Sequence, residues 1–137
     1  MSPELDKKLV ETYPEIFRDR YSDIRSTAMC WGFECGDGWY DLVDSLCRKL
    51  TFLSKVSGLQ IVADQVKEKF GTLRFYFHTE GETKEEGWFD IVNDVVDVSE
   101  HRSRYTCEVC GEYGECEATR GWYSTLCEVH RKERESE

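Results

Sequence analysis

The sequence lacks an excess of positive charge. Its 137 residues include 18 Lys and Arg against 28 Asp and Glu, so the formal net charge is −10 at pH 7. Nucleic acids and anionic membranes attract proteins through a positive field. The composition therefore disfavours broad binding to either surface, although it leaves room for a local cationic patch.

Long apolar runs are also missing. The segment from Met1 to Lys8 carries charged residues where a secretion signal has its apolar core. No stretch approaches the roughly 20 apolar residues that a membrane helix needs. We therefore expect no membrane partner and a cytoplasmic location. Hydrophobic residues make up 39% of the chain and aromatic residues 13%, which is too rich for a disordered protein.

Cysteine, in contrast, is plentiful, with seven residues. An odd number of thiols cannot pair completely, and a reducing cytoplasm disfavours disulfides. The cysteines are therefore interpreted as metal ligands, buried small side chains or reactive thiols.

Hydrophobic periodicity predicts an α+β protein. Apolar residues at helical spacing indicate one helix from Leu42 to Leu53 that stops at Gly58, and a second from Phe89 to Ser99. Between these segments, alternating residues around Gly71-Thr72 predict a β-hairpin with a type II′ turn at those two positions. The expected architecture is two main amphipathic helices packed on this small antiparallel sheet. Residues 1–104 would form the α+β domain, and residues 105–137 a C-terminal zinc-knuckle or zinc-ribbon module.

The strongest motif is a C-x2-C…C-x2-H pattern formed by Cys107, Cys110, Cys127 and His130. Two residues between paired ligands allow one tight turn to direct both side chains at the same zinc ion. Four protein ligands leave no coordination position open, so the pattern predicts a structural Zn²⁺ rather than a catalytic one. Cys116 lies between the pairs, and the sequence does not show whether it contacts the metal.

Two further cysteines lie in the glycine-rich stretch from Cys30 to Trp39. Cys35 precedes a helix start, which would lower the pKa of its thiol and allow a nucleophilic role with His78 or His101. A second metal site at Cys30 and Cys35 is an alternative, as is a turn with thiols packed inward. Cys47 falls among the apolar helix positions and is interpreted as a core residue.

The predicted hairpin collects positive charge on one face. With a turn at Gly71-Thr72, Lys69 would lie opposite Arg74 and Lys67 opposite Tyr76, while Phe70 would lie opposite Leu73 on the buried face. Like charges across a strand pair repel each other, so the face needs an anion. Carboxylates from elsewhere in the fold could supply it. The functional alternative is a phosphate- or carboxylate-bearing ligand held by the four residues Lys67, Lys69, Arg74 and Tyr76, with a ring stacked on Tyr76 or on a nearby Trp.

The stretches Cys30–Trp39 and Val66–Phe75, followed by the cysteine and histidine tail, together resemble a group of small proteins encoded by phages and bacterial genomes. The resemblance spans residues 28–130. Because the group has no established activity, the resemblance implies a setting, including the host cytoplasm for a phage protein, and no mechanism. The tail alone, residues 107–130, is similar to zinc-ribbon and zinc-knuckle modules, which bind nucleic acid, proteins or nothing.

These observations favour a small, non-enzymatic zinc-binding protein that acts as a binding module. In a phage setting it would inhibit or sequester a host protein or an anionic nucleotide ligand. A nucleic-acid-binding, zinc-finger-like regulator is the first alternative; it rests on basic residues near the zinc motif, namely Arg102, Arg104, Arg120, Arg131 and Lys132. A cysteine-dependent enzyme that uses Cys35 is the second.

Overall fold

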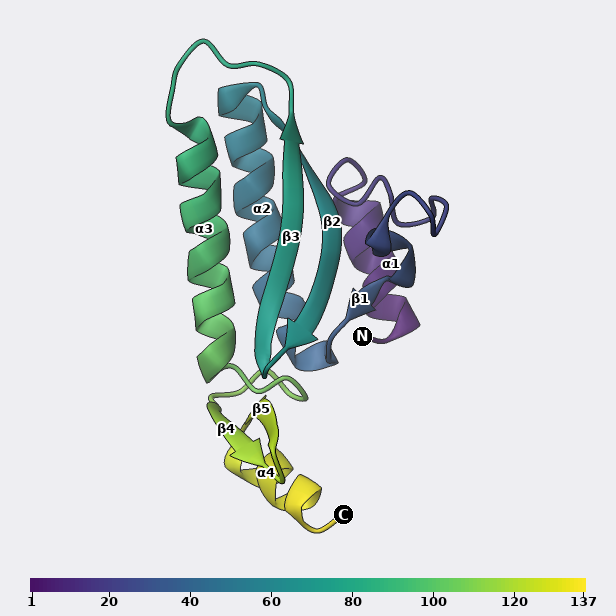
Figure 1. Ribbon diagram of the computed structural model, residues 1–137, viewed down its shortest axis with the longest axis vertical. Coiled ribbons are helices and arrows are strands. Elements are labelled where there is room, and N and C mark those ends of the chain that lie inside the picture. Colours follow the sequence, from purple (N-terminus) through teal and green to yellow (C-terminus); the bar gives the residue numbers. More distant parts are fainter.

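The architecture, shown in Figure 1 as a computed structural model that describes residues 1–137, combines helices with two small sheets. In chain order the elements are α1 (Pro3–Thr12), η1 (Ala28–Trp31), β1 (Phe33–Glu34), η2 (Asp37–Trp39), α2 (Tyr40–Ser57), β2 (Gln60–Lys69), β3 (Thr72–Glu80), α3 (Trp88–Arg102), η3 (Ser103–Tyr105), β4 (Glu115–Thr119), β5 (Trp122–Leu126) and α4 (Glu128–Glu135). The α+β class predicted from periodicity is therefore confirmed. None of the helices combines the length and apolar character that crossing a bilayer requires.

Both predicted main helices form. Helix α2 ends at Gly58, whose φ of 81° is the left-handed conformation that closes many helices. Its buried side chains include Leu46 and Leu50, and those of α3 include Val92 and Val96. Helices α2 and α3 lie beside each other along the larger sheet, and α1 lies beyond β2, near β1 (Figure 1).

The larger sheet has three strands in the order β1-β2-β3, so it extends beyond the predicted hairpin. The short strand β1 pairs with β2 in parallel, whereas β2 and β3 are antiparallel with a bulge between Ala63 and Gln65. The expectation of a purely antiparallel sheet is therefore wrong. Two residues, Phe33 and Glu34, are too few for alternation to reveal a strand in the sequence.

The turn of the β2–β3 hairpin lies one residue earlier than expected. Its central residues are Phe70 and Gly71, with φ of 54° and 82°. Positive φ at both positions is typical of a type I′ turn, whose twist matches that of the adjoining strands. The carboxylate of Glu68 stabilises this turn by accepting the backbone N–H of Gly71 at 2.8 Å. The predicted type II′ turn at Gly71-Thr72 is therefore wrong.

This shift changes which residues are paired across the hairpin. Lys69 lies opposite Thr72, and Lys67 lies opposite Arg74. The predicted pairs of Lys69 with Arg74 and of Lys67 with Tyr76 do not form. A cation nevertheless still lies directly across from a cation, because Lys67 and Arg74 share the same face.

The face of the sheet toward the helices carries the core. Leu73 is fully buried there, as predicted, Val66 is fully buried and Phe75 nearly so, and Phe17 packs edge-on against Phe75. Phe70, which was predicted to be buried, is 67% exposed because it occupies the turn. Helix α3 and the following turn η3 also close the free edge of β3: Glu100 of α3 accepts the N–H of Phe75 through a carboxylate oxygen, and Ser103 Oγ of η3 accepts that of Leu73, both at 2.8 Å. On the opposite face, called the open face below, Tyr76 is exposed and Lys67 and Arg74 are half-buried.

We expect the substitution Phe70→Asn to stabilise the fold by about 1 kcal/mol, because Asn adopts positive φ with less strain than Phe at this turn position. Urea unfolding should show a higher midpoint with an unchanged slope. The matched change Gly71→Ala should do the opposite, since a Cβ there would lie 3.0 Å from Cys116 Sγ and from the Ser124 amide nitrogen. A lower midpoint for Phe70→Asn would contradict the prediction.

Candidate metal centre

The fold brings Cys107, Cys110, Cys127 and His130 together so that their ligand atoms all lie within 4.8 Å of one another. The Sγ atoms of Cys110 and Cys127 are 3.8 Å apart, and Cys107 Sγ lies 3.7 Å from His130 Nδ1. A tetrahedral zinc site with Zn–S bonds of about 2.3 Å has S–S edges of about 3.8 Å. The observed spacing therefore fits an ion at the centre, and the cluster could hold a metal such as zinc.

The two ligand pairs come from different kinds of local structure. Cys107 and Cys110 flank a tight turn in which the Gly111 N–H donates to the Cys107 carbonyl at 2.9 Å. Cys127 caps the N-terminus of α4, where its Sγ accepts the His130 backbone N–H at 3.5 Å. The β4–β5 hairpin connects the pairs. The module is therefore a knuckle, a hairpin and a helix, which refines the expected zinc knuckle or ribbon.

The sulfur atoms influence one another's protonation. Burial alone would raise the pKa of the Cys107 thiol, but backbone N–H groups of Cys127, Cys110 and Val109 donate to it and lower its pKa to about 6. At Cys110, the Glu112 backbone donor lowers the pKa, but burial and the neighbouring Cys107 and Cys127 sulfurs outweigh it and raise the pKa. Three thiolates at this spacing repel one another, and a divalent cation removes that repulsion.

His130 directs its Nδ1 atom toward the sulfurs, at 3.1 Å from Cys127 Sγ. Its other ring nitrogen, Nε2, faces the Glu133 carboxylate at 4.0 Å. Metal-binding histidines commonly orient their second nitrogen toward a carboxylate in this way, which fixes the ring and raises its basicity. Nδ1 is therefore the nitrogen available to a metal.

The turn formed by residues 107–111, here called the knuckle, packs against the backbone of Gly36 and Gly38, here called the glycine socket. The N–H of Gly38 donates to the Glu108 carbonyl at 2.8 Å, and the N–H of Gly36 donates to the Glu108 carboxylate at 2.9 Å. A Cβ at Gly38 would lie 2.2 Å from the Cys107 carbonyl oxygen, so only glycine allows this approach. The sequence analysis missed this role; the two glycines spaced two apart were the signal available.

Further contacts hold the module against the end of the α+β core. The indole N–H of Trp39, a fully buried side chain, donates to the Thr106 carbonyl at 2.8 Å. The buried Thr125 hydroxyl donates to the Gly71 carbonyl at 2.7 Å, at the tip of the β2–β3 hairpin. The predicted boundary at residue 104 stays a prediction, but these bonds show that the two parts are in contact.

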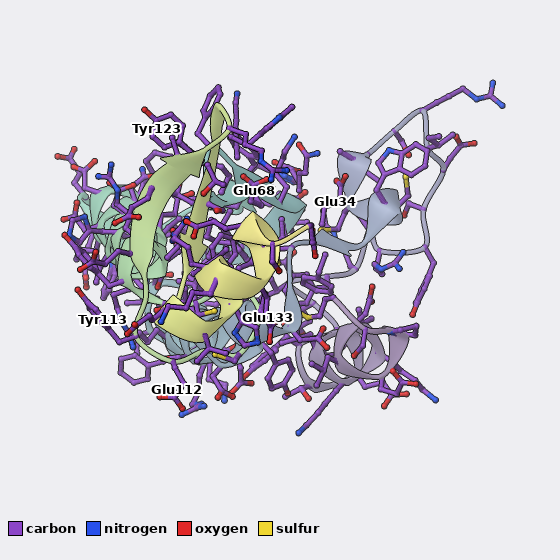
Figure 2. All side chains as sticks on the ribbon, turned by 90° about the horizontal axis from the view of Figure 1, so that it is seen from below. Glu34, Glu68, Glu112, Tyr113, Tyr123 and Glu133 are labelled. Atoms are coloured by element: carbon purple, nitrogen blue, oxygen red, sulfur yellow. The ribbon has the colours of Figure 1, made fainter.

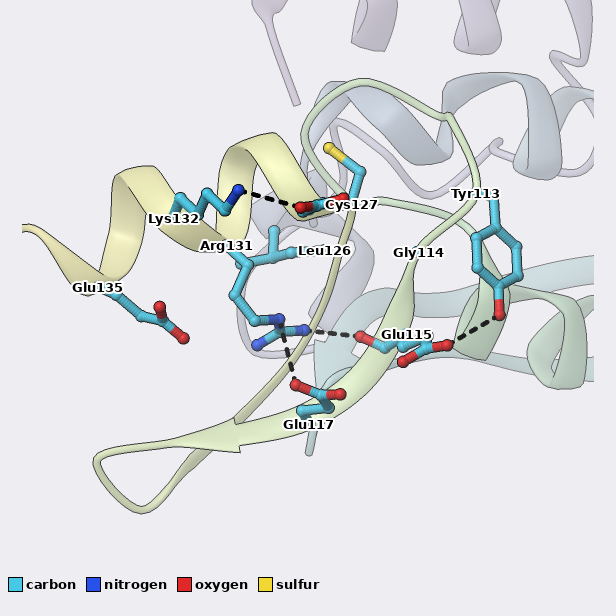
Figure 3. Close-up of a pocket in the computed structure, with 10 residues that line it drawn as sticks. Tyr113, Gly114, Glu115, Glu117, Leu126, Cys127, Arg131, Lys132 and Glu135 are labelled. Carbon is cyan, nitrogen blue, oxygen red and sulfur yellow. Dashed lines mark hydrogen bonds and ion pairs between the residues drawn. The ribbon is translucent and has the colours of Figure 1, made fainter.

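Arg131 joins α4 to the hairpin inside the module (Figure 3). Its guanidinium donates to the carbonyls of Glu115 and Ser124 at 2.6 and 3.0 Å, and its Nε lies 3.6 Å from a Glu117 carboxylate oxygen. Lys132 pairs with Glu128 at 3.0 Å. Both residues belong to the basic set that suggested nucleic-acid binding, and both are occupied within the protein.

The surface around the module is also rich in carboxylates. Figure 2, which views the molecule from the module end, shows Glu34, Glu68, Glu112 and Glu133 on that side. Arg120 is likewise engaged, since it donates to the carbonyls of Glu137 and Glu135 at 3.0 and 3.3 Å. Three of the five residues on which the nucleic-acid alternative rests, Arg120, Arg131 and Lys132, are therefore engaged within the protein, whereas Arg102 and Arg104 are exposed.

The cysteines outside the cluster have other surroundings. The Cys116 Sγ atom faces the Phe70 carbonyl at 3.8 Å and is not part of the cluster. Cys47 is fully buried, as predicted, and Cys30 faces the Thr27 carbonyl at 3.2 Å. Burial raises the pKa of the Cys35 thiol to about 12, so the predicted lowering by a helix start is wrong. This environment disfavours a thiolate at neutral pH.

The residues predicted to bind an anionic ligand do lie near one another on the open face of the sheet. Lys67 and Arg74 are paired across the strands, Lys69 lies near the turn and Tyr76 is 42% exposed on β3. His78, which the sequence analysis considered as a partner for Cys35, is instead bonded to Asp64 and Glu80 at 2.7 and 3.0 Å.

No protein-family model matches the chain, and no curated protein or solved structure matches it significantly. The resemblance to small phage and bacterial proteins therefore stays a prediction.

Proposed function

We propose that this protein is a zinc-stabilised, non-enzymatic binding protein that takes an anionic, nucleotide-like ligand on the open face of its larger sheet. The four-residue cluster fits a closed structural zinc site, because all four tetrahedral positions are supplied by the chain. In this proposal the metal stabilises the fold, and the ligand binds at a different surface of the protein.

The pairing of Lys67 with Arg74 is the observation that carries the proposal. The two cations lie directly opposite each other, and neither forms an ion pair within 4.0 Å. The nearest acidic group to Arg74 among the lining residues is Glu100, which interacts with the guanidinium electrostatically without pairing with it. The Nε atom of Arg74 is buried without any hydrogen-bond partner. Glu34 neighbours Lys67 in the sheet, but its carboxylate accepts the Gln65 amide at 3.2 Å. An anion would relieve this repulsion and satisfy the guanidinium.

The surroundings of Arg74 suggest what kind of anion would fit. Arg74 lines two shallow hollows along the junction of β3 and α3, one shared with His101 and Arg104 and the other with Tyr76 and Phe89. The first hollow offers the guanidinium groups of Arg74 and Arg104 to a phosphate group, and the Glu100 carboxylate lines both hollows beside them. The second offers aromatic side chains on which a base or ring can stack. This combination favours a nucleotide over inorganic phosphate alone.

Isothermal titration tests this proposal with adenosine and guanosine mono- and triphosphates, a cyclic dinucleotide and inorganic phosphate. We expect micromolar binding of at least one nucleotide. Lys67→Ala and Arg74→Ala should each weaken it about tenfold, the loss of one charge-assisted hydrogen bond. Tyr76→Ala should weaken nucleotide binding and leave phosphate binding unchanged.

Lys84→Ala is the matched control, because it removes one exposed lysine charge from the loop after β3 and should leave affinity unchanged. Absence of heat with every nucleotide would overturn the proposal. So would binding that Lys67→Ala and Arg74→Ala leave intact.

A further inference from the structure

The outward surface of the α2–α3 pair carries an apolar stripe that the core does not use. On α2 the stripe includes Phe52 and Val56, which are 64% and 50% exposed, and on α3 it includes Ile91 and Val98, which are 44% and 55% exposed. Val95, half-buried, lines a groove together with Phe52 and so connects the two halves. We call these five residues the helical stripe.

Helical spacing explains why the stripe is continuous. Ile91, Val95 and Val98 follow one another at intervals of four and three residues, so they share one face of α3. Phe52 and Val56 are four apart on α2, which runs antiparallel to α3 in the sheet-covering layer (Figure 1). Contiguous exposed apolar surface in a soluble protein marks an interaction site.

The charges beside the stripe differ between the two helices. The α2 side carries the exposed Lys49 and Lys55, whereas the α3 side carries the exposed Asp90, Asp94 and Asp97. None of these five residues has an oppositely charged side chain within 4.0 Å. Over this stretch, α2 therefore presents free cations and α3 free anions beside the apolar surface, while Asp41 and Arg102, at the opposite end of the two helices, carry the reverse signs.

We propose that the helical stripe binds a second copy of this chain. In a symmetric dimer, the same patch faces itself across a two-fold axis. An axis parallel to the helices places α2 of one subunit on α3 of the other, so that lysines meet aspartates on both sides of the apolar centre. An axis perpendicular to the helices would place α2 on α2 and lysines on lysines. The charge pattern selects the first arrangement.

The area of the helical stripe indicates the expected affinity of the dimer. Helix α3 has 15 residues and is therefore about 22 Å long, and two neighbouring helices make a face of comparable width. Such a face is at the small end of specific protein interfaces, which indicates a dimer in the micromolar range. Complementary charges contribute orientation and specificity more than affinity.

Sedimentation equilibrium across a range of protein concentrations tests the proposal on the zinc-loaded chain of residues 1–137. We expect a monomer–dimer equilibrium that Phe52→Ser shifts to monomer. A charge-swapped pair identifies the arrangement: the variant Lys49→Glu/Lys55→Glu and the variant Asp90→Lys/Asp94→Lys should each be monomeric alone. Mixed in equal amounts, they should form a heterodimer, because both contacts between unlike subunits are then attractive.

Circular dichroism of each variant confirms folding before the comparison, and Lys84→Glu controls for net charge. A wild-type monomer at every concentration would overturn the proposal. A dimer that survives Phe52→Ser, or two charge variants that fail to restore each other, would also overturn it. Nucleotide binding is measured separately on the sheet face, so either proposal can fail without the other.

Discussion

Removing zinc is expected to unfold residues 105–137 while α2 and α3 keep their structure. This segment buries only two apolar side chains, Cys107 and Leu126, so it has no core of its own. Structural zinc contributes about 10–16 kcal/mol of apparent binding free energy in small zinc modules, and that energy is coupled to folding. The helices depend instead on the main core, which includes Leu46, Leu50 and Val92.

Elemental analysis should therefore find one zinc per chain, and a chelator should abolish amide-exchange protection in β4, β5 and α4 but not in α2. Cys110→Ser should reproduce the effect of the chelator without any chelator. Cys116→Ser is the matched control, because this cysteine lies between the two ligand pairs and is not part of the cluster. Protein without stoichiometric zinc, or protection that survives chelation, would contradict the prediction.

The second large effect is expected for Gly38→Ala. A Cβ at this position would lie 2.2 Å from the Cys107 carbonyl oxygen and 2.6 Å from the Gly111 amide nitrogen. Both are backbone atoms of the knuckle, so neither can move aside as a flexible side chain would. Overpacking of this kind costs about 3 kcal/mol. We expect the knuckle to leave its socket, with exchange protection lost at both segment 36–39 and segment 105–112.

A control variant must distinguish loss of contact between the zinc module and the core from the backbone strain that any glycine-to-alanine change can cause. Gly87→Ala serves this purpose, because Gly87 has φ of 96° but no atom within 4 Å of the added Cβ. It should cost about 1 kcal/mol and leave the zinc module protected. Zinc stoichiometry should stay at one in both variants, since neither glycine is a ligand. If Gly38→Ala proved no more destabilising than Gly87→Ala, the socket would have no energetic role.

If both predictions hold, docking of the module at Gly36 and Gly38 depends on prior ordering of the module by zinc. Zinc orders the knuckle, and the ordered knuckle then fits the backbone of Gly36 and Gly38. The buried Thr125–Gly71 hydrogen bond extends the same contact to the tip of the β2–β3 hairpin. Lys67 and Arg74 lie on β2 and β3, close to the tip that joins these two strands. We therefore expect loss of zinc to weaken ligand binding on the open face of the sheet as well.

Local patterns in the sequence were sufficient for the elements whose cause is local. Helix α2 follows from apolar residues at helical spacing and a glycine stop at Gly58, because one face of a helix repeats every three to four residues. The sequence also predicted that Cys107 pairs with Cys110 and Cys127 with His130, because only two residues separate the members of each pair. The short distance along the chain already restricts where each pair can point.

Tertiary structure alone decided the remainder. The turn at Phe70-Gly71 depends on strand twist and on the Glu68 carboxylate, and a shift of one residue changed every predicted cross-strand pair. A helix start was expected to lower the pKa of the Cys35 thiol, but burial in the main core raises it instead. The socket joins residues about 70 positions apart, which no local pattern can reveal. Contacts at that separation exist only once the chain has folded. The sequence could therefore indicate the candidate metal ligands, whereas only the structure shows how their module is attached to the core.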